Sequence, residues 1–409
     1  MLKMVDGTGI IGLDMVCPLG GAVSPPQPPN YDNVEMEGAG SLMLPNSLKA
    51  PLERVELTGN SVQGENPAPE NPQEIKSAGR FDEASGKYLF DVKVTGKNLF
   101  DINNYVGSIK KISESEFHTE AKWGTLIGDI NLKAGGKYNI SYTFEIDSIT
   151  NSDCGVRIKC TKSDGTVSYI FDLPKMTGYV CNYTKSAVVP VGTVKCEILL
   201  YTDVKLKIGG TFKKLMIAED SENVALNIYE PYTEQFAKIA LNEPLRGIGE
   251  YNDTITKDGV ARKIKKAVFD GSEGWSIDKI VEGNTTQTFV LILKDVLSIP
   301  NHDKRIMCDK FKFGTALWTK DIVAIGTYSN KLYLNVEKDK TPDLQTFKTW
   351  LSQNPLTVDY VLAEPVTEPL PESVQQQLQA LHSENGVTHV FVDSGEVPCG
   401  IKLTYRKEK

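Results

Sequence analysis

The sequence predicts a mainly β protein, in which a jelly-roll β-sandwich is followed by a C-terminal β-rich mixed domain with two short helices. The first observation is the segment Lys137–Ile146, where apolar side chains occupy every second position. Because successive side chains of a strand point to opposite faces, this pattern places one face on a core. The second observation is that the alternation recurs in three short runs: Val156–Cys160, Val167–Phe171 (Val167, Tyr169 and Phe171 in phase) and Val194–Leu200. The third is the pair Asp164-Gly165, which supports the positive φ of a tight hairpin turn. Short strands joined by such turns are typical of antiparallel sandwiches.

Length and composition indicate a soluble, multidomain chain. The 409 residues favour two to three domains, and 40% hydrophobic with 24% charged residues is ordinary for globular proteins. No run approaches the ~18 apolar residues of a membrane span, and the first residues lack the apolar middle of a signal peptide. We therefore expect no membrane insertion and folding in the cytoplasm of the producing cell.

The charge balance argues against nucleic acid as a partner. The net charge is −8, and an acidic chain gains little from counterion release on DNA. The most basic stretch, residues 257–266, is interpreted as the solvated edge of a hairpin that turns at Asp258-Gly259.

No constellation of catalytic residues is visible, and we expect neither enzymatic activity nor a cofactor. Gly7–Gly12 matches GxGxxG, but Pro18 and Gly20 follow too soon for the helix that would receive a pyrophosphate. No motif singles out a catalytic pair among the 53 Asp and Glu residues, although sequence alone does not exclude a glycosidase pair.

The cysteines and histidines suggest no metal site. Seven cysteines include no CxxC, and the four histidines are scattered. Cys160 and Cys196 are in phase with apolar neighbours and are interpreted as buried thiols, while disulfide pairing stays open.

The N-terminal half divides into three parts. Residues 1–50 are rich in Gly and Pro and form either an attachment arm ordered against a neighbour or a flexible tail. Residues 51–96 are an extended β-hairpin linker region, with a turn at Ser85-Gly86. Residues 97–233 form the sandwich.

Residues 234–409 form the C-terminal domain. Thr341 is the predicted N-cap of a helix with Pro342 at its first position, an apolar stripe through Phe347 and an end at Asn354. A second short helix is predicted over Pro371–Ser383, and strands follow it.

Several strings closely resemble tail-tip and minor structural proteins of bacteriophages that infect Gram-positive bacteria. In patches over residues 50–409 they are GNSVQGENPAPENPQEI (59–75), GKNLFD (96–101), FKKLMIAE (212–219), IYEPYT (228–233), VFDGSEGW (268–275), TFKTWLSQNPLTVDYVLAEP (346–365) and THVFVDSGEVPCGIKLTYRK (388–407). The resemblance implies a virion tail protein assembled in the host cytoplasm, with a jelly-roll similar to carbohydrate-binding modules. It also implies other tail or baseplate proteins as partners, which we place at residues 1–50, and a homo-oligomer, with a trimer favoured.

Sugar binding needs aromatic faces and polar groups that fix orientation. The candidate ligand-binding residues are Trp123, Tyr183 and Tyr201, all in the sandwich; the alternative is that they are ordinary packing residues of its edge and strands. We expect a structural component of a phage tail tip, baseplate or tail fibre that recognises host-surface glycan by multivalent binding. A purely structural adaptor fits the same sequence. The alternative from another class is a free carbohydrate-binding protein or an accessory module of a glycan-degrading system.

Overall fold

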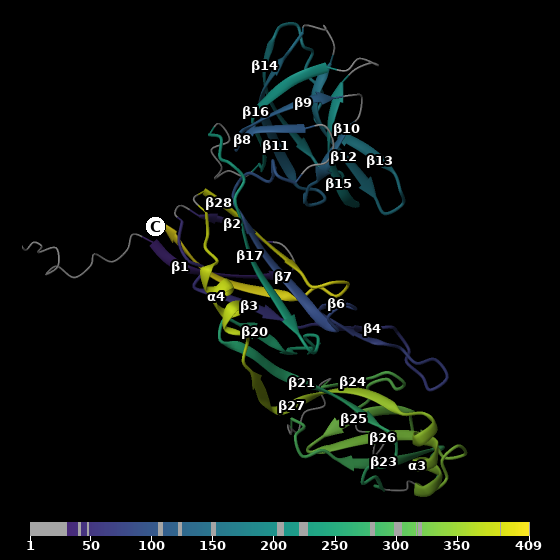
Figure 1. Cartoon of the computed structure of the whole chain (residues 1–409). Coiled ribbons are helices and arrows are strands. Elements are labelled where there is room, and N and C mark those ends of the chain that lie inside the picture. The colour runs from purple at the N-terminus through teal and green to yellow at the C-terminus, as the bar shows by residue number, and fades with distance from the viewer. Residues whose placement is uncertain are drawn as a thin grey trace, which may run out of the picture.

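The computed structural model contains three β-rich units in a row, which give the molecule an elongated shape (Figure 1). It describes residues 31–39, 42–46, 49–104, 109–121, 125–148, 153–202, 208–220, 228–278, 283–297, 305–315, 317, 321–384 and 386–408. Two helices and many antiparallel strands are present in these ranges, so the predicted fold class is confirmed.

The unit at one end is the β-sandwich. Its five-stranded sheet has the order β14-β11-β16-β9-β8 and its four-stranded sheet the order β10-β15-β12-β13. The strands are β8 (Ile109–Ser113), β9 (Glu116–Ala121), β10 (Thr125–Asp129), β11 (Lys137–Ile146), β12 (Cys154–Lys162), β13 (Val167–Ile170), β14 (Val180–Val188), β15 (Thr193–Thr202) and β16 (Ile208–Glu219).

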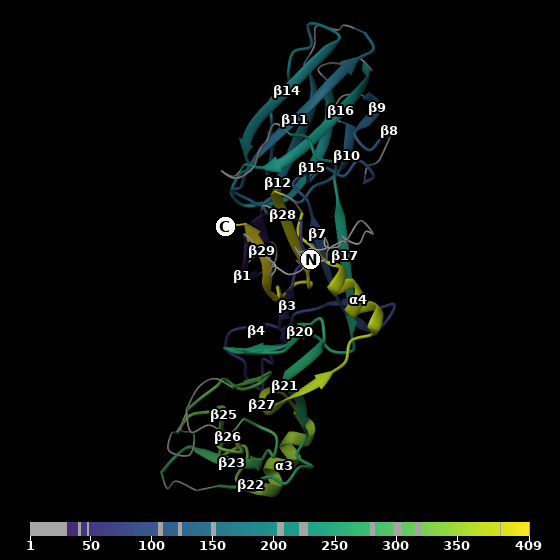
Figure 2. The same cartoon turned by 90° about the vertical axis from the view of Figure 1, so that its left-hand side faces the viewer.

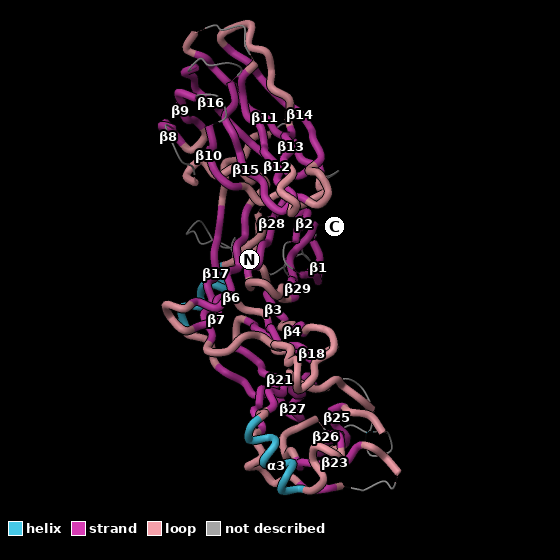
Figure 3. The backbone as a smooth tube through the Cα atoms, turned by 90° about the vertical axis from the view of Figure 1, so that its right-hand side faces the viewer, coloured by secondary structure: helices cyan, strands magenta, loops and turns pink. Residues whose placement is uncertain are grey.

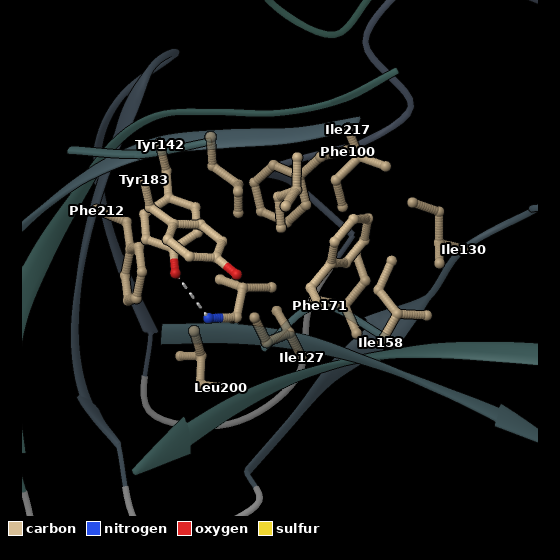
Figure 4. Packing of buried hydrophobic residues seen from close by; sticks show 14 of the residues in the cluster. Phe100, Ile127, Ile130, Tyr142, Ile158, Phe171, Tyr183, Leu200, Phe212 and Ile217 are labelled. Atoms are coloured by element: carbon tan, nitrogen blue, oxygen red, sulfur yellow. Dashed lines mark hydrogen bonds between the residues drawn. The ribbon is translucent and has the colours of Figure 1, made fainter. Parts of the chain in front are cut away.

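The core of the sandwich lies between these sheets, as Figure 4 shows. The apolar positions of β11 are buried as the alternation predicts, and the rings of Phe144 and Phe212 stack with centroids 4.1 Å apart. The phase predicted for β13 is wrong: Val167 and Tyr169 face solvent, and Ile170 enters the core. The strand ends at Ile170, and Phe171 returns to the core only because its φ of 69° turns the chain.

The central unit packs two sheets on one apolar core. One sheet has the order β17-β7-β28-β2, with β6 added on β7; the other has the order β1-β29-β3-β20-β21-β27-β24. The strands are β1 (Tyr31–Ala39), β2 (Leu42–Asn46), β3 (Arg54–Thr58), β6 (Arg80–Asp82), β7 (Lys87–Thr95), β17 (Glu234–Leu241), β20 (Thr254–Thr256), β21 (Gly259–Phe269), β24 (Ile306–Cys308), β27 (Leu356–Glu368), β28 (Gly386–Asp393) and β29 (Gly400–Glu408). Helix α4 (Glu372–Ala380) adds Val374 and Leu378 to this core.

Both outer units are insertions into hairpins of the central sheets. β7 ends at Thr95 and pairs with the start of β17 at Glu234, so the whole sandwich lies between two paired strands. In the same way β21 ends at Phe269 opposite Leu356, the first residue of β27, and the distal unit lies between them. Figure 2 shows β7 with β17 on the sandwich side and β21 with β27 on the other.

This topology differs from the predicted linker at residues 51–96. These residues supply β3 and β7, whose partners β29, β17 and β28 come from distant parts of the chain. Local patterns carry no information on such partners, which is why the stretch resembles an isolated hairpin in the sequence. Residues 31–39 and 42–46 likewise form β1 and β2 rather than an irregular arm, and β1 lies beside β29 in the central unit (Figure 3). Residues 1–30 lie outside the described ranges.

The distal unit contains the sheet β22-β23-β26-β25, the helix α3 (Leu344–Gln353) and the adjoining ends of β21 and β27. Its strands are β22 (Ser276–Ile277), β23 (Thr286–Ile292), β25 (Ala324–Tyr328) and β26 (Lys331–Glu337). Phe289 stacks on Phe347 with ring centroids 3.8 Å apart, as the apolar stripe predicts. The N-cap is Asp343 rather than the predicted Thr341, whose hydroxyl donates instead to the Glu337 carbonyl.

Four short strands connect these units: β4 (Ser61–Gln63), β5 (Ile75–Ser77), β18 (Gly247–Ile248) and β19 (Tyr251–Asn252).

Candidate functional site

The two outer faces of the sandwich differ in how their polar groups are satisfied. On the five-stranded face the polar side chains bind one another. Lys213 lies 2.8 Å from Glu145, and the Thr143 hydroxyl donates to Asn182 at 2.7 Å. Such a self-paired surface offers few free groups to a ligand.

The four-stranded face contains an arginine between two tyrosines. The Arg157 guanidinium lies 4.6 Å from the ring centroid of Tyr201 and 5.8 Å from that of Tyr169, both within cation–π range. Tyr169 is 50% exposed, and Arg157 and Tyr201 are half-buried. We call these three side chains the tyrosine–arginine platform.

Strand register positions the platform. Arg157 is opposite Leu199, so Tyr201, two residues along β15, is a diagonal neighbour; Tyr169 on β13 is the diagonal neighbour on the other side. Tyr201 itself is opposite Gly155, whose φ is +156°. A Cβ at Gly155 would meet the Tyr142 hydroxyl oxygen at 2.2 Å, so this position requires glycine.

Within the described part of the chain, Arg157 has no carboxylate partner, and its buried Nε has no hydrogen-bond acceptor. An arginine presents five N–H donors, and buried donors are normally satisfied. The guanidinium therefore has hydrogen-bonding capacity that the described residues of the protein do not use.

A row of ion pairs crosses the sheet next to the platform. Lys159 and Lys195 bind the Glu197 carboxylate at 2.7 and 2.9 Å, and Lys195 also lies 3.2 Å from Asp129. Hydrogen bonds from the two lysines lower the pKa of Glu197. Together with Arg157, the four side chains of this row carry three positive and two negative charges, a net charge of +1 for these five groups.

The three ligand-binding residues predicted from the sequence lie in different parts of the structure. Tyr201 belongs to the platform. Tyr183 lies in the core: its ring centroid is 5.1 Å from that of Tyr142, its hydroxyl donates to the Asp172 carbonyl, and burial raises its pKa to about 12 (Figure 4). Trp123 lies outside the described residues.

Sequence reasoning missed Arg157 and Tyr169. Arg157 shows no signal beyond its outward phase in β12, between the inward-facing Val156 and Ile158. The two-residue spacing of Tyr169 and Phe171 predicts that both face the core, whereas Tyr169 lies on the outer face.

A metal centre and a membrane-spanning helix are both absent from the described residues. No three His, Cys, Asp or Glu side chains there come together closely enough to hold a metal ion. No described helix has both the length and the apolar character needed to cross a membrane.

Comparison with known proteins gives no family. No family model matches the chain, and no curated protein matches it. Among solved structures, the chain is similar to particles derived from infectious bursal virus, with 6% identity and a TM-score of 0.17 over 95% of this chain and 82% of that one. A structure of the infectious bursal disease virus Gt strain gives 7% identity and a TM-score of 0.16 over 94% and 84% of the two chains. Similarity at this level supports no conclusion about function.

Proposed function

We propose that this chain is a non-enzymatic virion component of a bacteriophage tail tip, baseplate or tail fibre, and that it contributes to host-surface recognition by binding glycan. The observation that carries the binding role is the tyrosine–arginine platform, where Arg157 has no carboxylate partner among the described residues. The strings that resemble phage tail proteins support the placement in a virion.

Binding at the platform would combine stacking with directed hydrogen bonds. The exposed ring of Tyr169 provides an apolar face for the C–H groups of a sugar ring. Arg157 lies beside it and supplies donors for ring hydroxyls or for an acidic substituent. The local excess of cations favours the acidic substituent.

One platform offers a small, solvated contact, so a single site binds weakly. Copies held in a ring or trimer convert weak contacts into avid attachment, because the second contact forms at a high effective concentration. This gain in affinity would allow an oligomeric tail component to recognise a repetitive cell-surface polymer.

The test is glycan-array and whole-cell binding of the purified protein, with its oligomeric mass measured by light scattering. We expect saturable binding that Tyr169→Ala and Arg157→Gln each weaken roughly tenfold per site. Tyr179→Ala is the matched control, because Tyr179 is a tyrosine of the same unit that is 59% exposed, whereas the rings next to Arg157 are those of Tyr169 and Tyr201.

Two results would overturn parts of this proposal. A stable oligomer that binds no host surface would remove the recognition role and leave a structural adaptor. Purified virions that lack the protein would remove the virion role.

A further inference from the structure

Two adjoining cavities lie where the sandwich meets the central unit. Their volumes are about 230 and about 620 Å³, and they share the lining residues Leu99, Asp129, Ile130, Asn131 and Phe391. The larger is within the range of roughly 300–1,000 Å³ typical of small-molecule sites. β7 and β28 line the cavities from the central unit, and residues 127–133 with the start of β15 line them from the sandwich.

Two buried polar side chains of the central unit line these cavities, and each has one atom with no hydrogen-bond partner among the described residues. His389 lines the larger cavity and is 5% exposed, and its Nε2 has no partner in the described ranges. Thr95 lines the smaller cavity and is 2% exposed, and its Oγ1 likewise has none within those ranges. The two residues are directly opposite each other in β28 and β7.

An unsatisfied buried polar group costs about 1–3 kcal/mol, and native proteins contain few of them. Two in one cross-strand pair beside adjoining cavities indicate that a molecule in the cavities, water or ligand, supplies the missing hydrogen bonds. Burial lowers the pKa of His389 to about 4, so its imidazole is neutral at pH 7 and acts as one donor and one acceptor.

An aromatic ring adjoins these groups. Phe391 lies two residues after His389 on the same face of β28, and the two rings are stacked, with centroids 6.1 Å apart and planes at 20°. Phe391 lines both cavities, and Tyr232 lines the smaller one.

The charged groups of the cavities are largely balanced. Lys195 pairs with Asp129 at 3.2 Å, Asp393 with Arg80 at 2.8 Å, and Lys93 with Glu234 at 3.2 Å. Glu219 and Lys133 add one charge of each sign to the larger cavity, and Asp101, whose carboxylate accepts hydrogen bonds from Asn103, adds one negative charge to the smaller cavity. Balanced charge offers little to an ion, whereas an aromatic face with neutral donors and acceptors suits a hydroxyl-rich molecule.

We propose that this junction is a second ligand site that takes a neutral saccharide of one or two rings. Thr95 and His389 supply buried hydrogen bonds and Phe391 supplies the stacking face. The site is separate from the tyrosine–arginine platform, so either can fail without the other. Because its walls come from two units, a bound saccharide also joins the sandwich to the central unit.

The experiment is a titration of the full-length protein, labelled with ¹⁵N-histidine, with glucose, galactose, rhamnose and N-acetylglucosamine, each as mono- and disaccharide. His389→Gln identifies the His389 imidazole signals among those of the four histidines. We expect one or more of these sugars to shift the His389 signals saturably at millimolar concentration, and to leave in place the signals of His118, which lines neither cavity.

Variants then test the contacts. Thr95→Val removes the hydroxyl at nearly constant volume and is expected to weaken binding roughly 3- to 10-fold, as for one neutral hydrogen bond. Phe391→Ala is expected to weaken it at least as much, while Tyr169→Ala on the platform leaves it unchanged. Thermal unfolding verifies that each variant is folded.

Three results would overturn the inference. The first is wild-type protein whose His389 signals respond to no sugar, which would mean that the cavities hold water alone. The second is unchanged affinity in both the Thr95→Val and Phe391→Ala variants. The third is equal shifts with sodium sulfate, which would mark the cavities as an anion site.

Discussion

The carboxamide oxygen of Asn98 accepts a hydrogen bond from the backbone N–H of Ile217 at 3.1 Å, which joins the entrance of the sandwich to its last strand. The same oxygen accepts from Phe100, and the amide nitrogen donates to the carbonyls of Leu215 and Glu230. Asn98 is 1% exposed. Three of the phage-like strings, those at residues 96–101, 212–219 and 228–233, therefore meet at one side chain. These three strings share one structural role, which is to close the sandwich where the chain enters and leaves it.

Asn98→Ala should destabilise the sandwich strongly. The change removes four hydrogen bonds to backbone groups, three of them buried and one part-buried, so we expect the free energy of unfolding to fall by about 3 kcal/mol or more. Denaturant unfolding of the full chain measures it. Asn103→Ala is the control, because Asn103 is exposed and its side chain makes only exposed contacts. Equal effects of the two changes would contradict the role of Asn98.

Gly155→Ala should disturb both the core and the platform. The new Cβ would meet the Tyr142 hydroxyl at 2.2 Å, and the φ of +156° is unfavourable for alanine, so we expect a loss of about 2–4 kcal/mol. Gly178→Ala, where nothing lies within 4 Å, should be near neutral. Tyr142→Phe removes the obstructing oxygen, so the double variant should lose less than the sum of the single changes. If the losses of the two single variants add up to that of the double variant, the contact with the Tyr142 hydroxyl is not what makes alanine unfavourable at position 155.

The pH dependence of stability should contain a contribution from Asp359. This carboxyl is 2% exposed, and burial raises its pKa to about 6 against the opposing effect of Arg246, 3.8 Å away. Because the folded pKa lies above the unfolded value of about 3.9, the folded state holds the proton more tightly. The contribution is present below pH 4 and is lost as the pH rises to 6.

Asp359→Asn should remove this contribution and raise the free energy of unfolding at pH 7, relative to that at pH 4, by about 2 kcal/mol. His389 titrates with the opposite sign, since its pKa is lowered to about 4 and its contribution is lost as the pH falls. The quantity to measure is therefore the difference between variant and wild type in urea unfolding at pH 4, 5, 6 and 7. A difference that does not change with pH would refute the assignment.

The insertion topology predicts that the sandwich can be removed. Thr95 and Glu234 are paired neighbours in β7 and β17, so replacing residues 96–233 with Asn-Gly should close a two-residue hairpin. We expect the shortened chain to keep its β-rich circular dichroism spectrum and to unfold cooperatively. An unfolded product would show that the central unit needs the sandwich for its own stability.

How well the sequence predicts this structure depends on how far apart along the chain the interacting residues lie. Alternation in β11 and the apolar stripe of α3 are local, and both predictions are confirmed. The pairing of β7 with β17 joins residues separated by the whole sandwich, and the closure at Asn98 joins positions more than a hundred residues apart, so no local period reveals either. The helix begins at Leu344, so its N-cap is Asp343, whose carboxylate accepts from the Thr346 N–H, whereas the Thr341 hydroxyl donates to the Glu337 carbonyl. The sequence predicts only part of the platform. Tyr201 is a predicted ligand-binding residue, whereas the ring contacts of Arg157 depend on β13 and β15 lying on either side of β12.

The paired strands that enter each outer unit have a mechanical consequence. Force applied to the sandwich passes into the central unit through β7 and β17 together, and these strands share backbone hydrogen bonds along eight residue pairs from Glu234↔Thr95 to Leu241↔Tyr88. A single break of the chain inside the sandwich leaves both halves covalently attached to the centre. A protease would therefore have to cut twice before an outer unit could leave the central unit.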